Sequence, residues 1–244
     1  MSGHSKWSQI KRQKGVADQK RGALFTKLGH AIALAARKGG SGDPEMNLQL
    51  RLEMDRARSF NMPKETMERA IRRGTGDDAE GRVFEEIMYE GYGPGGTALL
   101  IGTTTDNRNR TSSSIRQLLT KHGGKLGSSN TVLWMFARKG VLLVPMGTDP
   151  DSQELALIDL GPDDVKRSPD GFVVTVSPET LMATRNRITA LGQTVDYAQI
   201  DYVPTTTAGA LSADDSQKLD TLVETLEDDP DVSSVTTNYV ADSA

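Results

Sequence analysis

The sequence predicts an α+β protein with three domains, a helical bundle followed by two α/β sandwiches. Apolar residues recur at helical spacing up to about Gly74, and after Gly81 the periodicity falls to two or to short apolar runs. The stretch between these glycines is rich in Gly and Asp, which is typical of a domain boundary. A chain of 244 residues is long enough for two or three domains of roughly 70 to 100 residues each.

Three amphipathic helices are expected in the first domain. The first covers 18–40 and ends in a pair of glycines. Asp43 followed by Pro44 is a start signal for the second, because Asp accepts bonds from free amides and Pro fits the first turn. The third covers 63–74 and starts at a proline. Together they form a small bundle.

The second part of the chain alternates strands and helices. The expected elements are strands 84–89 and 97–104, helix 110–122, strands 132–136 and 141–144, helix 154–160, strands near 165 and at 172–176, helix 178–191, strand 194–203, helix 213–227 and strand 232–239. The order β-α-β-β-α-β after residue 140 indicates a ferredoxin-like sandwich. The preceding segment lacks a final helix and strand, which the tail can supply.

These patterns predict the domain limits. We expect a basic arm and three-helix domain over 1–76, a discontinuous α/β domain over 81–139 plus 205–244, and an inserted α/β domain over 140–204. The fold class is therefore α+β, with two ferredoxin-like domains, the third domain being inserted in the second.

Charge is sorted along the chain. Residues 1–76 carry sixteen Lys/Arg against seven Asp/Glu, a net charge of +9, and the next segments carry −6 over 77–106, +7 over 107–148 and −14 over 149–244. The formal net charge of −4 hides this order. A protein with a basic face gains counterion-release energy when it binds a polyanion, so the pattern indicates a nucleic-acid partner. Whether the two basic blocks share one face is left open.

The first basic block is predicted to contain a nucleic-acid-binding arm. Residues 1–15 have only Trp7 and Ile10 as sizeable apolar groups, so no helical stripe can bury them. Trp7 offers a face for stacking an unpaired base, worth roughly 1 to 3 kcal/mol, and His4 either donates to a phosphate or sits exposed. The cations expected to bind phosphates are Lys6, Lys11, Arg12, Lys14, Lys20, Arg21 and Lys27. The alternative is a solvated tail with Trp7 packed on the bundle.

The second basic block has no acidic residue from Asn107 to Thr148. Arg108 and Arg110 fall at the entry to a predicted helix, whose free amides favour an anion, and Arg116 lies about two turns further on. We expect these three arginines to bind nucleic acid, the alternative being that they balance the acidic domains. Lys121, His122 and Lys125 are weaker candidates, because cations at the far end of a helix simply suit its macrodipole.

Motifs for enzymatic chemistry are weak. Residues 91–96 fit G-x-G-x-x-G, but a strand follows instead of a helix, so a tight glycine turn is expected instead of a dinucleotide site. The histidines His4, His30 and His122 show no zinc spacing, and the serines at 112–114 lack G-x-S-x-G. We predict no catalytic residue, no metal and no cofactor. The rival is a Mg²⁺-dependent phosphoesterase that uses acids of the second half.

The composition suits a soluble cytoplasmic protein. The absence of cysteine excludes disulfides and thiolate sites and suits a reducing compartment. The first residues have no apolar region, and the longest apolar stretch, near 31–36, is far too short to cross a bilayer. We expect no membrane partner and no small-molecule substrate.

Several distinctive motifs follow one another along the chain. They are GHSKW at 3–7, RGALFTKL at 21–28, DPEMN at 43–47, NMPKETMERAI at 61–71, YEGYGPGG at 89–96, and NRNRT at 107–111 followed by KHGGKLG. Together they resemble the motifs of the YebC/PmpR family. The resemblance spans nearly the whole chain and implies a helical domain followed by two α/β domains, the third inserted in the second. The sequence departs from the family pattern at Ser129-Asn130-Thr131 and at Pro162, which bears on turn geometry.

The resemblance implies a regulator of gene expression, since the family's members include bacterial transcriptional regulators and a mitochondrial translational activator. We expect a non-enzymatic nucleic-acid-binding protein that acts through its basic helical domain. No convincing helix-turn-helix stands out in residues 1–76, and a basic arm with one tryptophan suits RNA at least as well as DNA. A ribosome-associated factor that binds ribosomal RNA and relieves stalls is favoured; a double-stranded DNA-binding regulator is the alternative. A protein-binding scaffold is a third hypothesis.

Overall fold

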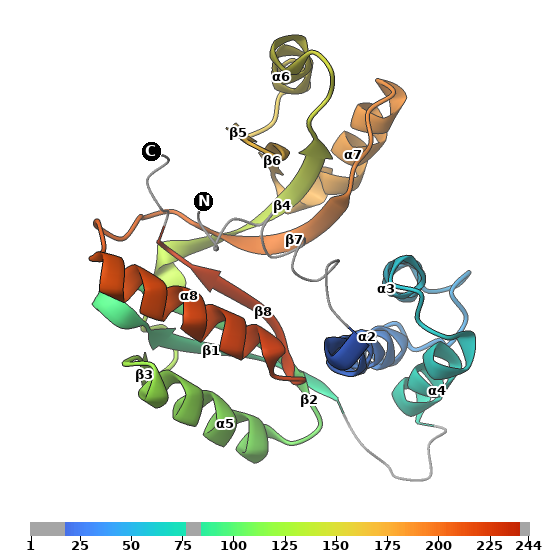
Figure 1. Ribbon diagram of the computed structural model, residues 1–244. Coiled ribbons are helices and arrows are strands. Elements are labelled where there is room, and N and C mark those ends of the chain that lie inside the picture. The colour runs from blue at the N-terminus through green and yellow to red at the C-terminus, as the bar shows by residue number, and fades with distance from the viewer. Residues whose placement is uncertain (1–17, 77–83, 240–244) are drawn as a thin grey trace.

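The structure is a computed structural model that describes residues 18–76 and 84–239, with side chains described from Arg21 onward (Figure 1). The predicted arm, from His4 to Lys14, lies outside the described residues, as does the side chain of Lys20. The described chain forms one helical unit and two four-stranded antiparallel sheets.

The helical unit is organised around its longest helix. Helix α2 (Asp18–Lys38) packs against both α3 (Leu48–Ser59) and α4 (Lys64–Thr75), and buried leucine, isoleucine, methionine and alanine side chains of the three helices form one core. Gly74 lets α4 approach α2 closely, because a Cβ at this position would lie 2.1 Å from the carbonyl oxygen of Ala33. The expected bundle is therefore confirmed.

The start of α3 differs from the prediction. Asn47, and not Asp43, is the N-cap: its Oδ1 accepts a hydrogen bond from the Leu50 amide at 3.1 Å. Its Nδ2 donates to the carbonyl oxygen of Ala35 at 2.9 Å and so ties the cap to the end of α2. The predicted start of the helix at Asp43 and Pro44 was therefore wrong. Asn47 is the better cap because its buried side chain bonds a backbone group of α2 as well as one of α3.

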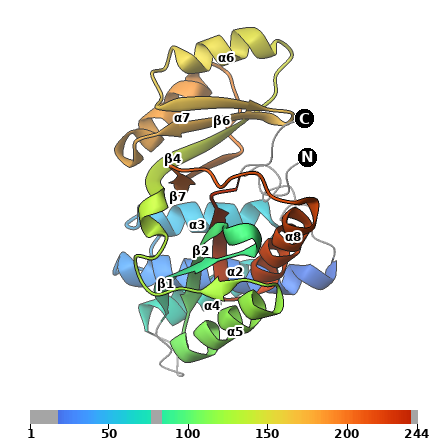
Figure 2. The same ribbon diagram turned by 90° about the vertical axis from the view of Figure 1, so that its left-hand side faces the viewer.

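The first sheet combines distant parts of the chain. Its order is β3 (Lys125–Leu126), β1 (Glu85–Tyr92), β2 (Ala98–Thr105) and β8 (Val232–Thr237). Helices α5 (Arg108–Lys121) and α8 (Ala213–Asp228) cover one face of this sheet (Figures 1 and 2). The strand and the helix that the middle segment lacked come from the tail, so the expected fold class is confirmed.

The second sheet is a ferredoxin-like sandwich inserted between β3 and α8. The chain runs through β4 (Phe136–Pro145), α6 (Pro150–Ile158), β5 (Asp164–Ser168), β6 (Gly171–Val176), α7 (Leu181–Ala190) and β7 (Tyr197–Pro204). The strand order is β5-β6-β4-β7, and α6 and α7 pack on one face. The domain limits stay a prediction, and β4 runs across the limit expected at residue 140.

The two sheets are joined through β4 and β7. Phe136 at the start of β4 and Tyr202 near the end of β7 pack against Ala98 and Leu100, which point away from α5 and α8. The long ribbon of β4 and β7 thus covers part of the sheet face that the helices leave uncovered. Figure 2 shows this ribbon descending from the upper sheet toward β1 and β2.

Glu90 shapes the connection between the sheets. Its side chain points from β1 into the protein, and the residue is only 6% exposed. It accepts hydrogen bonds from three backbone amides, those of Asn130 at 2.6 Å, Val132 at 2.7 Å and Leu133 at 2.8 Å. These bonds hold the chain where it forms a 3₁₀ turn over Leu133–Met135. The strand predicted over 132–136 was therefore wrong, and β4 begins only at Phe136.

We expect Glu90→Ala to lower the free energy of unfolding by about 3 kcal/mol, because a buried amide and two partly buried ones lose a charged acceptor. Urea denaturation monitored by far-UV circular dichroism measures the change. Glu85→Ala, an exposed substitution on the same strand, is the control and should change stability by less than about 0.5 kcal/mol. Equal stability of the two variants would contradict the role of Glu90.

Candidate nucleic-acid interface

The helical unit docks on the first sheet through α2. Arg37 donates from Nη1 to the carbonyl oxygen of Phe84 at 3.0 Å, and Lys38 forms an ion pair with Glu86. The ring of His30 lies 4.7 Å from that of Phe84, and the guanidinium of Arg73 lies 6.0 Å from the same ring. Phe84 therefore stands at the centre of this junction.

His30 is a buried titratable group at the junction. Burial lowers its pKa from the usual value of 6.5, and the positive charge of Arg73 acts in the same direction. The charges of Asp231 and Asp106 and a backbone hydrogen bond at Thr104 oppose this effect. His30 is thus a buried residue of the docking surface, and it belongs to no group of three possible metal ligands within the residues that the structure describes.

Lys27, predicted to bind phosphate, is directed into the protein. Its Nζ donates a hydrogen bond to the carbonyl oxygen of Glu227, near the C-terminal end of α8. Desolvation lowers the pKa of Lys27 from 10.5 to about 8, although the carboxylates of Glu227, Asp229 and Asp228 raise it. The ammonium suits the negative end of the helix macrodipole, so it joins α2 to α8.

Arg110, another predicted site residue, is held by two carboxylates. Its Nη2 lies 2.8 Å from Oδ2 of Asp231 and 3.0 Å from Oδ1 of Asp106. The hydrogen bond to Asp231 is the main reason why its pKa is raised. The hydroxyl of Thr111 also donates to Asp231, at 2.7 Å. Arg110 still has a side chain that is 54% exposed, but much of its charge is neutralised within the protein.

Arg108 and Arg116 extend the predicted set along the exposed side of α5. Asn107 caps this helix by accepting a hydrogen bond from the Arg110 amide at 3.1 Å. The carbonyl oxygen of Arg108 accepts a hydrogen bond from the Tyr89 hydroxyl at 3.3 Å. The side chain of Arg108 is exposed. The structure thus brings Arg108, Arg110 and Arg116 onto one helix and places Lys27 on another. Arg21 is exposed on α2.

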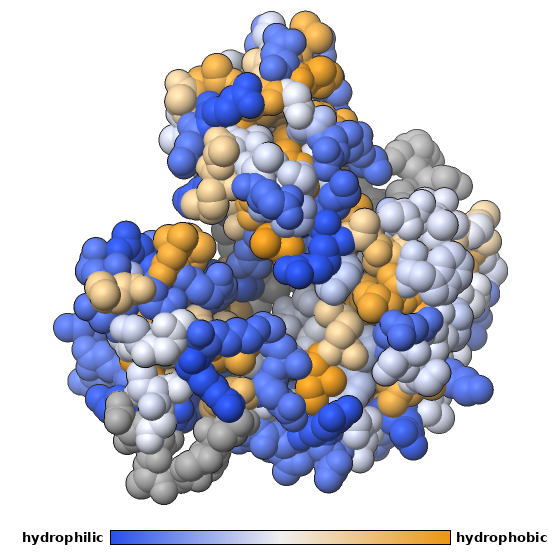
Figure 3. Space-filling view, turned by 180° about the vertical axis from the view of Figure 1, so that it is seen from behind, coloured by the Kyte–Doolittle hydropathy of each residue, from blue (hydrophilic) through white to orange (hydrophobic). Residues whose placement is uncertain are grey.

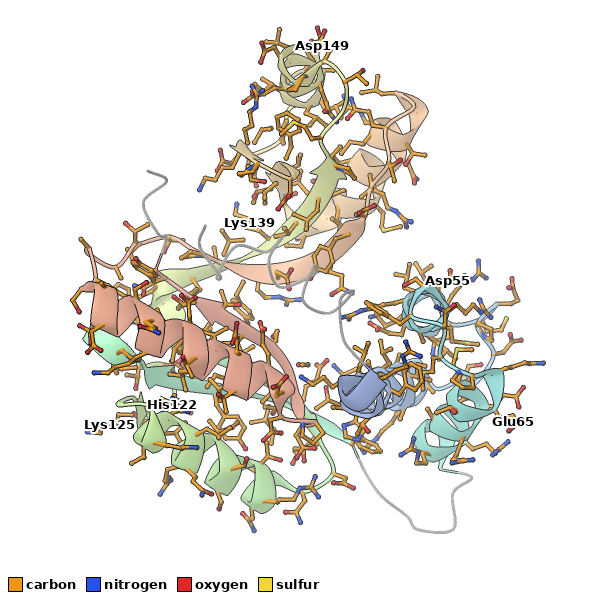
Figure 4. The ribbon with its side chains drawn as sticks, viewed as in Figure 1. Asp55, Glu65, His122, Lys125, Lys139 and Asp149 are labelled. Carbon is orange, nitrogen blue, oxygen red and sulfur yellow. The ribbon has the colours of Figure 1, made fainter. Side chains whose placement is uncertain are left out.

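The residues that border a shallow recess on α5 were not predicted as one set from the sequence. It has a volume of about 560 Å³ and is lined by Ser112, Ser113, Arg116, Gln117, Thr120 and Lys121. The sequence signal was present, because these residues repeat at a spacing of four within a segment without acids. His122 and Lys125 follow the recess, beyond the end of α5 (Figure 4).

Neither a metal site nor a membrane segment is found in the described part of the chain. No group of three His, Asp or Glu side chains in residues 18–76 and 84–239 could hold a metal ion. No helix of these residues is both long and apolar enough to cross a membrane. On the face in Figure 3, small apolar patches are separated by hydrophilic residues.

The buried ammonium of Lys27 makes stability depend on pH. Between about pH 8 and 10.5 the unfolded chain keeps the proton of Lys27 and the folded protein does not, so the free energy of unfolding rises with pH in this window. We expect this contribution to be about 3 kcal/mol and to vanish in Lys27→Met. Urea denaturation at pH 7 to 10.5 measures it. Lys64→Met, whose lysine side chain is 86% exposed, is the control. If the free energy of unfolding changes with pH in the same way for wild type and Lys27→Met, the burial of the charge is contradicted.

Comparison with known proteins identifies the family. Residues 5–77 match the TACO1/YebC protein N-terminal domain, and residues 84–239 match the TACO1/YebC second and third domain. A probable transcriptional regulatory protein of Pelotomaculum thermopropionicum is 44% identical over 98% of both chains, and one of Moorella thermoacetica is 46% identical over 98% of this chain and 95% of its own. The crystal structure of a conserved hypothetical protein, Aq1575 from Aquifex aeolicus, matches with a TM-score of 0.88 and 39% identity over 98% of both chains. The chain belongs to the TACO1/YebC family of regulatory proteins.

Proposed function

We propose that this protein is a non-enzymatic regulator of gene expression that binds nucleic acid through its basic arm and through α5. The observation that carries the proposal is the sorting of charge: a basic N-terminal segment and an acid-free segment from Asn107 to Thr148 in an otherwise acidic chain. The names of the relatives, which are probable transcriptional regulatory proteins, support a role in gene regulation.

Ribosomal RNA is the favoured partner in this proposal. All three arginines of α3 are ion-paired with acids, Arg51 with Glu45 at 2.8 Å, Arg56 with Glu53 at 3.9 Å and Arg58 with Asp55 at 2.7 Å. A helix that reads the major groove needs side chains free for base edges, and α3 is poorly suited to this. RNA is bound more often through its backbone and through unpaired bases, which suits arm cations and the indole of Trp7. The proposed role is that of a ribosome-associated translation factor that relieves stalls in the cytoplasm.

The second candidate is a transcriptional regulator that binds double-stranded DNA. The names of the relatives favour it. Both candidates share phosphate binding, so affinity for a polyanion alone does not separate them.

Recovery of the tagged protein from cell lysate, with and without nuclease, separates the two candidates. We expect ribosomal particles to co-purify with the protein and to be lost after ribonuclease treatment, because the contact is with RNA. Enrichment of specific promoter fragments that resists ribonuclease and disappears with deoxyribonuclease would support the DNA-binding candidate instead.

The salt dependence of binding tests the arm. If five to eight cations bind phosphates, log K against log[salt] should have a slope of roughly −4 to −7. Replacing Lys6, Lys11 and Arg12 by Ala should make the slope shallower by about 2 to 3. The matched control replaces Lys64, Lys166 and Lys218, three exposed lysines elsewhere, and changes the net charge equally. An unchanged slope for the arm variant would mean that these residues do not bind phosphate.

A further inference from the structure

The exposed face of α5 has an unusual composition. Its residues form two rows with a spacing of four, Ser112, Arg116 and Thr120 in one row and Ser113, Gln117 and Lys121 in the other. Residues four apart are neighbours on a helix surface, so the rows run side by side and border the recess of about 560 Å³. Each row carries one cation and two neutral polar groups, and neither carries an acid.

The cations of these rows are available to a ligand. Within the part of the chain that the structure describes, no ion pair involves Arg116 or Lys121. Arg110, nearly two turns before Arg116, is instead engaged by Asp231 and Asp106. Binding at Arg116 or Lys121 therefore costs no internal salt bridge, whereas binding at Arg110 competes with two carboxylates.

The face is also held rigidly. On the opposite side of α5, Thr111, Ile115 and Leu119 are buried against the first sheet, and Ser114 donates to Oδ2 of Asp229 at 2.7 Å. The polar rows thus point away from a packed core. Figures 1 and 2 show no helix or strand on the outer side of α5.

We propose that this face of α5 binds the sugar–phosphate backbone of RNA without reading its sequence. The proposal rests on the nucleic-acid-binding function and specifies the residues and the ligand of its contact on α5. Arg116 and Lys121 would each neutralise one phosphate, since most contacts of nucleic-acid-binding proteins go to the backbone. The face lacks an aromatic residue that could stack a base, which makes it a backbone site.

The neutral groups of the rows favour RNA over DNA. The hydroxyls of Ser113 and Thr120 and the amide of Gln117 can both donate and accept hydrogen bonds, whereas a phosphate oxygen only accepts. The hydroxyl of Ser112 donates to the carbonyl oxygen of Asn109 at 3.2 Å, which leaves it as an acceptor. A ribose 2′-OH both donates and accepts, so it is the matching ligand group. From Ser112 to Lys121 the helix rises about 14 Å, enough to run beside about four nucleotides.

Two sets of substitutions test the site by affinity for an RNA hairpin and a DNA hairpin of the same sequence over a range of salt. Arg116→Ala with Lys121→Ala should weaken RNA binding roughly ten-fold and make the salt slope shallower by about 1.4 to 1.8. Ser113→Ala, Gln117→Ala and Thr120→Ala together should weaken RNA binding roughly three-fold and leave DNA binding unchanged. The control, Lys166→Ala with Arg185→Ala, removes the same charge from the other sandwich. It should change neither RNA binding nor DNA binding.

Each outcome decides a separate question. If the Arg116 and Lys121 variant binds RNA with wild-type affinity and an unchanged salt slope, this site is overturned. The proposed contact through the arm is not affected by that result. Equal losses for RNA and DNA in the hydroxyl and amide variant overturn the assignment to RNA. Failure of the wild-type protein to bind either hairpin overturns the proposed function together with this site. Thermal unfolding of all variants should match the wild type, because the changed side chains lie outside the cores.

Discussion

The arrangement of the middle of the molecule depends on the carboxylate of Asp231. Its side chain is almost fully buried and accepts hydrogen bonds from Arg110 and Thr111 at the start of α5. Its carbonyl oxygen accepts the amide of Thr104 at 2.8 Å, next to the end of β2. A buried charge of this kind is tolerated only when donors surround it, so β8, β2 and α5 must adopt one relative position. Strand β8, which pairs with β2 at the edge of the sheet, is held in that position.

The same region couples the sheet to the helical unit. His30 of α2 lies within the electrostatic influence of Asp231 and Asp106, and Lys27 reaches the end of α8. The acidic second half of the chain therefore has an internal role, since its carboxylates attract the cations of α2. Charge sorting along the sequence thus serves docking between parts of the molecule as well as the proposed binding of a polyanion.

The division of the arginines and lysines follows from this geometry. Some cations are bound by other groups of the protein, as Lys27 and Arg110 are, whereas Arg116 and Lys121 are exposed and form no ion pair within residues 18–76 and 84–239. A rigid helix that carries unpaired cations is better suited to a ligand than one whose cations are already neutralised, because no internal contact is lost on binding. We therefore regard α5 as the part of the described chain that best fits the proposed function.

The sequence by itself determined the elements and their order. Periodicity was sufficient for α2, for α8 and for most strands of both sheets, because apolar spacing depends only on near neighbours; the short strand β3 was not predicted. It failed at Asn47 and at Val132, because both positions depend on a hydrogen bond to another element. The Asn47 side chain donates to the backbone of α2, and the Val132 amide donates to the side chain of Glu90 on β1. Only the tertiary structure decided which predicted site residues are bound by other groups of the protein and which face solvent. Asp231 is 121 residues from Arg110 and Glu227 is 200 residues from Lys27, and no local pattern can show that such distant groups form hydrogen bonds with each other.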